Sequence, residues 1–435
     1  MTSDAGLLPL AEFDRRWRLT ERIAGCLVDS RSDPEHSLLE MLRQRLFGIL
    51  ADYEDCNDHD ALRDDPVFKL VAGRTPDDDP LASQPTLSRF ENSVRAQQLT
   101  ALFDLLVTTG VERLSDHHGG TTGGTLPERV VLDLDATDDP THGAQQLTLF
   151  HGYYGQYQYF PLVISEPTTK HVFLARLRHG TAHAALGADE DLRLVVEALR
   201  RRRQDVMVHA RGDSGFGVPW MYAVCEQLGV SYTFGLAGNA RLQRLAEPLL
   251  AEAQAEYART KTKQRLFATW SYQADSWDRA RTVIAKAECH AAGTNLRFVV
   301  TSERVTSAAE AEACYDAYIE RGESEQRMDE LKNGLCAGRL SCHRLLANVF
   351  RLLLHSFAYN LLAAVRDSEA TPVELRRAQP AKWRSRLIKV AAVVVQSTRR
   401  VKLELSGCWP YWDLLSAVTQ RVCTAPLVPA ASLPP

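Results

Sequence analysis

The sequence lacks the features of a membrane or secreted protein. It has no run of about 18 consecutive apolar residues, the length that a transmembrane helix needs. Its first residues, MTSDAGLLPLAEFDRRW, do not combine a basic region with an apolar run, so we expect no secretory signal. The 435 residues are 45% hydrophobic and 24% charged, which is typical of a globular protein of two or three domains. We expect a cytoplasmic protein without a membrane partner.

Cysteine pairs at the spacing of metal ligands are absent as well. The nine cysteines are an odd number and include no CxxC pair, which argues against zinc ribbons and a disulfide framework. Reduced thiols in a cytosol are the simpler interpretation. His117 and His118 stand in HHGGTTGGT, residues 117–125, where the glycines and threonines favour a flexible linker over a metal site.

The small net charge of −4 conceals an asymmetry along the chain. From Leu335 onward there are 14 Lys and Arg residues against 5 Asp and Glu, a net charge of +9, so the preceding part carries −13. A basic C-terminal part beside an acidic remainder is consistent with a polyanionic partner. A solvated basic surface explains this feature equally well.

The first hundred residues carry the pattern of helices. Leucines recur every four residues over 38–50, which predicts an amphipathic helix. A second helix is expected from Ser83, as its N-cap, to about Leu106, with a proline in its first turn. Ser88 and Arg89 near its start are placed to meet DNA phosphates. Acids outnumber bases in this region, so DNA contact is only slightly favoured over an ordinary helix.

Strand patterns follow the linker and predict a mixed α/β sheet. Three strands in a meander are followed by strand–helix–strand units. A strand-rich segment between about 239 and 302 then precedes a helical stretch from about 308 to 366, and we interpret it as an insertion. The expected strands are 129–136, 159–167, 171–178, 205–211 and 230–236, and the expected helices between them are 189–203 and 218–228.

Acidic residues stand at the ends of two of these strands. Asp133 and Asp135 are two positions apart, on one face of a strand whose other positions are apolar. Carboxylates there need a partner, and a divalent cation is the natural one, although a strand end that faces water is the alternative. Asp213 follows a later strand in a glycine-rich turn, where stabilisation of the turn alone would explain it.

A third acidic residue lies in YIERGESEQRMDELK, residues 318–332. Arg321, Glu325 and Lys332 follow Tyr318 by 3, 7 and 14 positions. On a helix these four side chains project within about 60° of one another. Such a face suits contact with metal ions and phosphates, although a surface helix with ion pairs has the same spacing. Asp329 falls near this face and is the rival third carboxylate.

The Tyr-x2-Arg-x3-Glu-x6-Lys spacing resembles that of DDE transposases of bacterial insertion sequences. The blocks LDLDATDDPTHGAQQ, GYYGQYQYFPL and RGDSGF are similar to the insertion-sequence-1380 family, and the similarity extends over nearly the whole chain. The resemblance implies an α/β fold with a ribonuclease-H-like catalytic core that a β-rich insertion interrupts, an N-terminal helical domain and a basic C-terminal helical part. The implied division is 1–125 for the helical DNA-binding domain with its linker, 126–238 and 305–366 for the core, 239–304 for the insertion and 367–435 for the basic region.

The resemblance also implies roles for individual residues. Asp135, Asp213 and Glu325 would be catalytic and would hold two Mg²⁺ ions, with Mn²⁺ as a substitute. Asp133 would be a further metal ligand or an accessory acid. The choice of the first ligand between Asp133 and Asp135 therefore stays open, with Asp135 preferred. Trp270 and Trp277 would stack on a flipped base or, as the better alternative, belong to the hydrophobic core. The DNA-binding residues would be Tyr318, Arg321, Lys332, Arg89, Arg376, Arg377 and Arg384.

The function that the resemblance implies is cut-and-paste DNA transposition. The protein would cleave at insertion-sequence ends, by way of a DNA hairpin, and transfer the ends to target DNA. Its partners would be double-stranded DNA, with terminal inverted repeats and target, and a second copy in a homodimeric synaptic complex. Three alternatives remain: a catalytically silent sequence-specific DNA-binding protein, a metal-dependent nuclease without end specificity and, more remotely, a glycosyltransferase-type Asp-x-Asp site.

Overall fold

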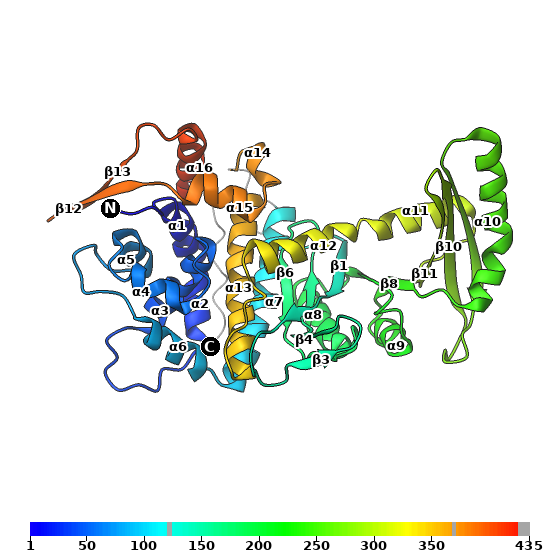
Figure 1. Cartoon of the computed structure of the whole chain (residues 1–435), viewed down its shortest axis with the longest axis horizontal. Coiled ribbons are helices and arrows are strands. Elements are labelled where there is room, and N and C mark those ends of the chain that lie inside the picture. The colour runs from blue at the N-terminus through cyan, green and yellow to red at the C-terminus, as the bar shows by residue number, and fades with distance from the viewer. Residues whose placement is uncertain (120–123, 368–370, 425–435) are drawn as a thin grey trace.

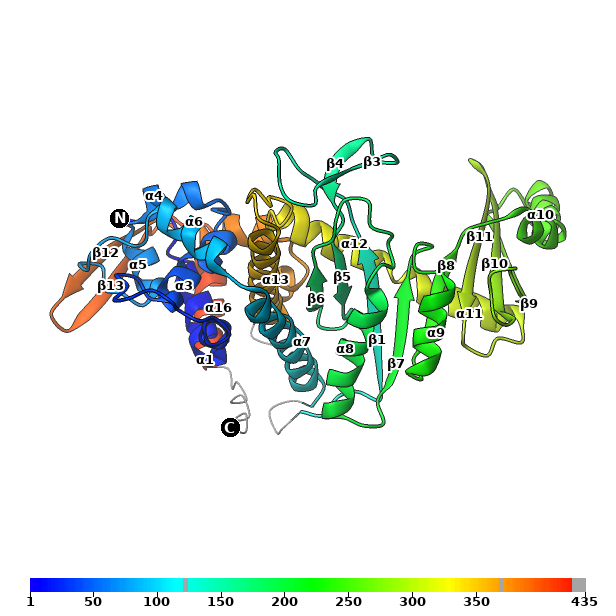
Figure 2. The ribbon, with the colours of Figure 1, turned by 90° about the horizontal axis from the view of Figure 1, so that it is seen from below.

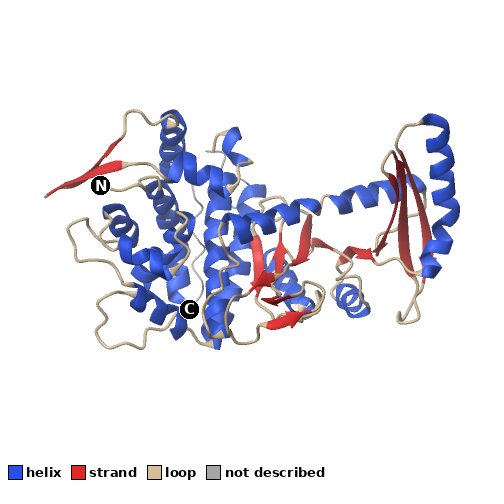
Figure 3. Cartoon of the chain, viewed as in Figure 1, coloured by secondary structure: helices blue, strands red, loops and turns tan. Residues whose placement is uncertain are grey.

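A computed structural model describes residues 1–119, 124–367 and 371–424. The molecule is elongated, with a helical part at one end, a mixed sheet through its middle, and strands covered by one long helix at the other end (Figure 1). The arrangement of helices and strands is that of a mixed α/β protein (Figure 3).

The central feature is an eight-stranded sheet of order β6-β5-β1-β7-β8-β11-β10-β9. Strands β5 and β6 continue antiparallel from β1, whereas β7 and β8 run parallel to it. The strands are β1 (Arg129–Ala136), β5 (Leu162–Ser165), β6 (Val172–Arg176), β7 (Met207–Gly212), β8 (Ser231–Leu236), β9 (Gln264–Tyr272), β10 (Arg281–His290) and β11 (Gly293–Thr301). The expected meander and the two following strands are confirmed.

The expected insertion is continuous with this sheet. β11 pairs antiparallel with β8, Phe298 opposite Leu236 and Thr301 opposite Thr233, so the three later strands extend the sheet without a break. The sequence pattern missed the long helix α10 (Ala240–Thr260), which packs on β9 and β10 and is largely exposed on its other side. A second, three-stranded sheet consists of β2 (Asp139–Pro140), β4 (Gln156–Tyr159) and β3 (Leu149–His151).

Helices cover the sheet and build the other parts of the molecule. Those that follow the sheet strands are α8 (Ala188–Arg202), α9 (Pro219–Gln227), α11 (Ala308–Ile319), α12 (Gly322–Asp329), the π-helical turn η3 (Glu330–Gly334) and α13 (Leu345–Asp367). The N-terminal helices are α1 (Leu7–Trp17), α2 (Leu19–Gly25), α3 (Leu38–Leu50), η1 (Cys56–Asp58), α4 (His59–Leu62), α5 (Pro66–Ala72), α6 (Gln84–Ser93) and α7 (Ala96–Gly119).

Two expectations about the N-terminal helices are wrong. The helix expected from Ser83 to Leu106 is two helices, because Val94 is extended, with φ −68° and ψ 138°, and separates α6 from α7. His117 and His118 lie in the last turn of α7, and His117 Nδ1 is 2.7 Å from an Asp367 carboxylate oxygen. The remainder of the expected linker falls partly outside the described residues.

The sequence suggested a helical C-terminal part, but the structure shows two strands there as well as helices. This part packs against the N-terminal helices: Thr2 forms a bridge with Ala392, and α16 lies on α1. An antiparallel hairpin stands between its helices. Its elements are α14 (Val373–Arg376), α15 (Pro380–Trp383), the π-helical turn η4 (Arg384–Ile388), β12 (Ala392–Ser397), β13 (Arg400–Leu405) and α16 (Trp412–Thr424).

Helix α13 is the core around which the N-terminal helices pack. Among the described helices it alone is long and apolar enough to cross a membrane, but 89% of its most apolar window is buried inside the protein. α1, α3, α6 and α7 contact it, and so does the sheet strand β6. Its burial explains its composition without a membrane.

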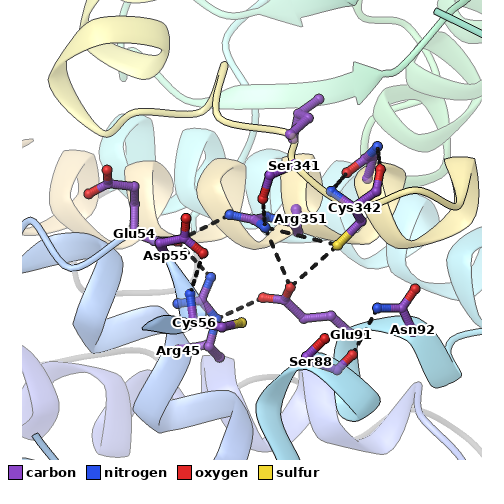
Figure 4. Close-up of polar contacts among 12 residues, drawn as sticks. Arg45, Glu54, Asp55, Cys56, Ser88, Glu91, Asn92, Ser341, Cys342 and Arg351 are labelled. Atoms are coloured by element: carbon purple, nitrogen blue, oxygen red, sulfur yellow. Dashed lines mark hydrogen bonds and ion pairs between the residues drawn. The ribbon is translucent and has the colours of Figure 1, made fainter. Parts of the chain in front are cut away.

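A buried charged cluster joins α3, α6 and α13 (Figure 4). Arg45 Nε donates to Glu91 Oε1 at 2.7 Å, and Arg351 Nη1 lies 3.8 Å from Glu91 Oε2. All three side chains are at most 2% exposed. One carboxylate therefore pairs with two buried guanidiniums, and removing it would deprive both of that partner.

Candidate active site

Asp133 and Asp135 share a face of β1 but have different surroundings. Asp133 is fully buried and accepts from Arg211 at both oxygens, Nε to Oδ1 at 2.7 Å and Nη2 to Oδ2 at 3.1 Å. Arg327, on α12, also donates to Oδ2. The guanidiniums of Arg211 and Arg327 therefore compensate the charge of Asp133, which does not need a metal ion for this purpose.

The two arginines also fix the helices above the sheet. Arg211 stands opposite Asp133 on the parallel strand β7, and its Nη1 donates to the Ala317 carbonyl oxygen of α11. Arg327 comes from α12 and donates from Nε to Ser165 Oγ on β5 at 3.1 Å. Asp133 thus connects the sheet to both helices: to the end of α11 through Arg211, and to α12 through Arg327.

Asp135 lies two residues further along β1, close to the end of this strand and beneath α12. Ser324 donates from its hydroxyl to Asp135 Oδ2 at 3.3 Å. Burial raises the pKa of Asp135 from its ordinary 3.8 to about 6. The charges of Asp213 and Glu325 add to this increase, and the Arg321 guanidinium opposes it. Asp213 and Glu325 are therefore both close enough to Asp135 to repel its charge.

Asp213 occupies the turn that follows β7, as the glycine-rich sequence predicts. Its Oδ1 accepts from the Gly215 amide at 2.8 Å, which holds the carboxylate in the turn. Gly235 of β8 lies directly beside this turn. A Cβ atom there would be 2.7 Å from the Ser214 nitrogen and 2.9 Å from the Tyr318 hydroxyl. The absence of a side chain at 235 lets the turn and Tyr318 approach each other.

Arg321 is the cation among these acids. Its Nη2 lies 3.2 Å from Glu325 Oε1, and its guanidinium stands 5.9 Å from the ring centroid of Tyr318. Burial lowers the pKa of Arg321, but Tyr318 and the three carboxylates raise it more, so the net shift is upward. The Glu325 side chain is 67% exposed and open to a ligand from solvent.

The helical face expected for residues 318–332 is not continuous. Tyr318 ends α11, Arg321 stands at the break before α12, and Glu325 lies on α12. Lys332 lies in the π-helical turn η3, where the angular step per residue differs from that of an α-helix. Its Nζ donates to Asp138, at 2.6 Å to the carbonyl oxygen and 3.1 Å to Oδ1.

Asp329, the rival third carboxylate, points elsewhere. It is exposed and accepts from the Asn333 amide at 2.7 Å. Glu325, unlike Asp329, is among the main charges that raise the pKa of Asp135. The structure thus brings Glu325, not Asp329, to the two aspartates.

An open cleft of about 380 Å³ adjoins Asp213 on the side of the later strands. Arg321 and Tyr318 form part of its wall, and Arg297 brings positive charge from β11. Lys286 of β10 also lines the cleft, with its ammonium 2.9 Å from Glu288 Oε2. The cleft therefore leads from the carboxylates to a basic wall, which suits a phosphate-bearing ligand. It is lined by Asp213, Ser214, Gly235, Leu236, Ala237, Gly238, Lys286, Asn295, Leu296, Arg297, Phe298, Val299, Tyr315, Tyr318 and Arg321.

The family model described as transposase DDE domain group 1 matches residues 1–427. The chain belongs to this transposase family. A solved structure of the piggyBac transposase synaptic complex with hairpin DNA is similar at 12% sequence identity and a TM-score of 0.43, and the match covers 98% of this chain and 83% of that chain. None of the curated proteins compared with the transposase matches it significantly.

The other predicted DNA contacts lie away from the three carboxylates. Arg89 is on α6 and donates to Thr86 Oγ1 at 3.1 Å. Arg376 donates to the Thr371 carbonyl oxygen at 2.8 Å, and Arg377 is exposed beside it. Arg384 Nη2 pairs with an Asp52 oxygen at 3.1 Å. These four arginines stand on the helical end of the transposase.

The two tryptophans of the insertion have different environments. Trp277 is buried, with its ring 5.2 Å from that of Tyr222 and 5.6 Å from that of Tyr272. Trp270 is partly buried on β9 and packs against the core. Neither lines the cleft beside Asp213. Both positions favour the interpretation as core residues.

Sequence reasoning missed the residues that surround Asp133 and Asp135. Arg211, Arg327 and Ser324 were not singled out, although Arg211 stands in an otherwise apolar strand pattern, VMVHARG, where a charged residue needs a partner. Another group of acids and a thiol, Asp52, Glu54 and Cys336, also lies together. Arg384 and Arg339 already neutralise its carboxylates.

Proposed function

We propose that this transposase cleaves DNA at the ends of a bacterial insertion sequence and joins those ends to target DNA. Asp135, Asp213 and Glu325 would hold two divalent cations, Mg²⁺ or Mn²⁺, at the site of cleavage. The observation that supports this most directly is the convergence of three carboxylates, from two strand ends and one helix, around a single arginine. Asp133, paired with Arg211 and Arg327, would act as a positioning residue.

The donor set fits hard divalent cations. Carboxylate oxygens are the ligands that such ions prefer. Burial, followed by the charges of Asp213 and Glu325, raises the pKa of Asp135, and a bound cation would offset this cost of ionising it. When bound, such ions would activate a water or a 3′-hydroxyl for attack on a phosphodiester and stabilise the leaving oxygen.

The other residues of the site would bind and orient the DNA. Arg321 would meet a phosphate by its planar fork, and the Tyr318 hydroxyl would donate to a phosphate oxygen. Lys332 would supply a further cation once its bond to Asp138 opens. A cut-and-paste route through a DNA hairpin belongs to this proposal, with Arg89, Arg376, Arg377 and Arg384 on the flanking duplex.

The fold supports a ribonuclease-H-like core as part of the same proposal. An antiparallel meander of β1, β5 and β6 followed by the parallel strands β7 and β8 fits such a core, with 239–304 as its insertion. We propose that the protein belongs to the insertion-sequence-1380 group, with the domain division 1–125, 126–238, 239–304, 305–366 and 367–435. It would act in the cytoplasm as a homodimer on paired terminal inverted repeats.

The test is cleavage of DNA that carries the element's own ends, with Mg²⁺ present or chelated. We expect Mg²⁺-dependent nicking that disappears in Glu325→Gln while binding of the DNA ends persists. Glu323→Gln is the matched control, because Glu323 is an exposed acid of the same helix outside the cluster. Nicking that survives in Glu325→Gln would refute the assignment of the third carboxylate, and a wild type that binds without cutting would favour a silent DNA-binding protein.

A further inference from the structure

The small sheet beside the active site carries an unusual exposed surface. We call residues 147–157, which comprise β3, the following turn and the start of β4, the aromatic hairpin. Phe150 is 52% exposed, Tyr157 59% and Tyr153 86%. Figure 2 shows β3 and β4 projecting from the rest of the molecule at one edge of the large sheet. Aromatic rings exposed together in this way need an explanation by function.

The exposure follows from the strand register. Phe150 and Tyr157 form a cross-strand pair, with ring centroids 5.5 Å apart, on the outer face. Gln158 faces inward, where its side-chain amide donates to the Gly180 carbonyl oxygen at 3.3 Å. The pleat alternates the two faces, so the aromatic rings point outward because the glutamines are fixed inward.

The aromatic hairpin is fastened to the active site. Gln156 Nε2 donates to Asp138 Oδ2 at 3.0 Å, and the other oxygen of the same carboxylate accepts from Lys332. Asp138 follows the metal-ligand candidate Asp135 by three positions. The aromatic hairpin is therefore tied both to the end of β1 and to the turn that follows α12.

Tyr154 lies in the turn of the aromatic hairpin and is 39% exposed. Its ring centroid is 5.0 Å from that of His151 and 6.2 Å from that of Phe160. Burial raises the pKa of Tyr154, and the charges of Asp138, Asp213 and Asp135 raise it further. Tyr154 therefore belongs to the same exposed aromatic surface, which Gln156, two positions later, ties to Asp138 near the candidate ligand Asp135.

We infer that the aromatic hairpin binds unpaired DNA bases next to the phosphodiester that the transposase cleaves. The inference rests on the proposed function and names a part of its substrate. Any ligand that reaches both Tyr154 and the carboxylates must be part of the substrate. No Lys, Arg, Asp or Glu occurs between Asp139 and Glu166, so the surface offers ring faces rather than charges. Rings of this kind stack on any base, whereas Lys332, which shares the Asp138 carboxylate with Gln156, is the neighbouring cation for a phosphate.

The expected effect is measurable in binding alone. Stacking of a base on an aromatic side chain contributes roughly 1–3 kcal/mol, so loss of one ring weakens binding of an unpaired base by about 5- to 150-fold. Fully paired DNA hides its base faces within the duplex, and its affinity should be unaffected by the same substitution.

The experiment uses the full chain without divalent metal, so that no cleavage occurs. One probe is a duplex that ends in a short unpaired overhang containing 2-aminopurine, and the other is the fully paired duplex of the same sequence. The wild type is expected to prefer the overhang and to quench the 2-aminopurine fluorescence. Tyr154→Ala and Tyr153→Ala should lose both the preference and the quenching, whereas Tyr154→Phe should keep them. Trp412→Ala is the matched control, because Trp412 is an exposed aromatic of α16, which lies at the helical end of the molecule and away from β3 and β4 (Figure 1).

The outcomes separate this inference from the proposed function. If the wild type binds neither probe, the proposed function fails. If it binds both probes equally, or if Tyr154→Ala lowers both affinities by the same factor, the inference is wrong and the proposed function stands. Oligomer loss in Tyr153→Ala and Tyr157→Ala, seen by sedimentation, with an intact preference for the overhang would mean that the aromatic hairpin contacts a second copy instead.

Discussion

Replacing each of the two neighbouring aspartates of β1 by asparagine should change stability in opposite directions. Asp133 is fully buried and pairs with two arginines that are 4–5% exposed. Asparagine keeps the shape but removes the charge, which leaves Arg327 without a carboxylate partner and Arg211 with only the exposed Glu320, 3.5 Å away. Breaking a buried pair in this way costs roughly 3–5 kcal/mol of unfolding free energy.

Asp135 presents the reverse case in the absence of metal. Its folded-state pKa of about 6 exceeds the ordinary 3.8, so the ionised carboxylate costs stability above pH 6. At 1.36 kcal/mol per unit, the cost at pH 7 is as much as about 3 kcal/mol. Asp135→Asn removes it, and we expect a gain in stability that shrinks as the pH falls from 6 toward 4, where the wild-type carboxyl becomes protonated.

The assay is urea unfolding followed by near-UV circular dichroism at pH 7 and at pH 5, in the presence of a chelator. Asp133→Asn should lower the unfolding midpoint, and Asp135→Asn should raise it at pH 7 and less so at pH 5. Cleavage in Mg²⁺ should disappear in Asp135→Asn although the protein is at least as stable as the wild type. An unchanged midpoint for Asp133→Asn, or a lowered one for Asp135→Asn, would refute the division of roles between the two residues.

Three further predictions concern other buried positions. Burial raises the pKa of Asp139 to about 8, so wild-type stability should fall as the pH rises from 4 to 8, and Asp139→Asn should gain about 1.4 kcal/mol per pH unit over the wild type in urea unfolding within that range. Gly235→Ala should push the turn that holds Asp213 away from Tyr318 and lower the cleavage rate about a hundredfold. Gly25→Ala, where an added Cβ meets nothing within 4 Å, should cleave at the wild-type rate. Glu91→Gln should lower the unfolding free energy by roughly 3–5 kcal/mol because two buried arginines lose their partner, while Glu256→Gln, at an exposed pair, should leave the midpoint unchanged.

Local patterns predicted most of the strands, because alternation and β-branched residues act within a few positions. β1 begins and ends where the sequence places it, at 129 and 136. The pairing of β11 with β8 joins residues more than 60 positions apart, and no local pattern contains that information. α10 escaped notice because its apolar stripe is narrow: only Leu242, Ala246 and Ala253 are buried in 21 residues, and Pro248 interrupts the pattern.

The spacing of the Tyr-Arg-Glu-Lys motif predicted a common face on the assumption of one straight α-helix. A break between α11 and α12 already interrupts that helix, although Arg321 and Glu325, four positions apart, still form an ion pair. The assumption also fails beyond Asp329, because the π-helical turn carries Lys332 to Asp138 instead. A constant angular step is a property of the hydrogen-bonding pattern, which the sequence did not reveal at this point.

The choice between Asp133 and Asp135 could not be made from the strand itself, since both carboxylates point to the same side of β1. The difference arises across the fold, where the partners of Asp133 are 78 and 194 positions away in sequence. Two guanidiniums satisfy Asp133 and at the same time fasten α12, which carries Glu325. Asp135, at the strand end, lies near Asp213 and Glu325, and the single Arg321 interacts with all three carboxylates. A residue with surplus opposite charge serves as an anchor, and a residue with a deficit of it is the one that a cation would bind most strongly.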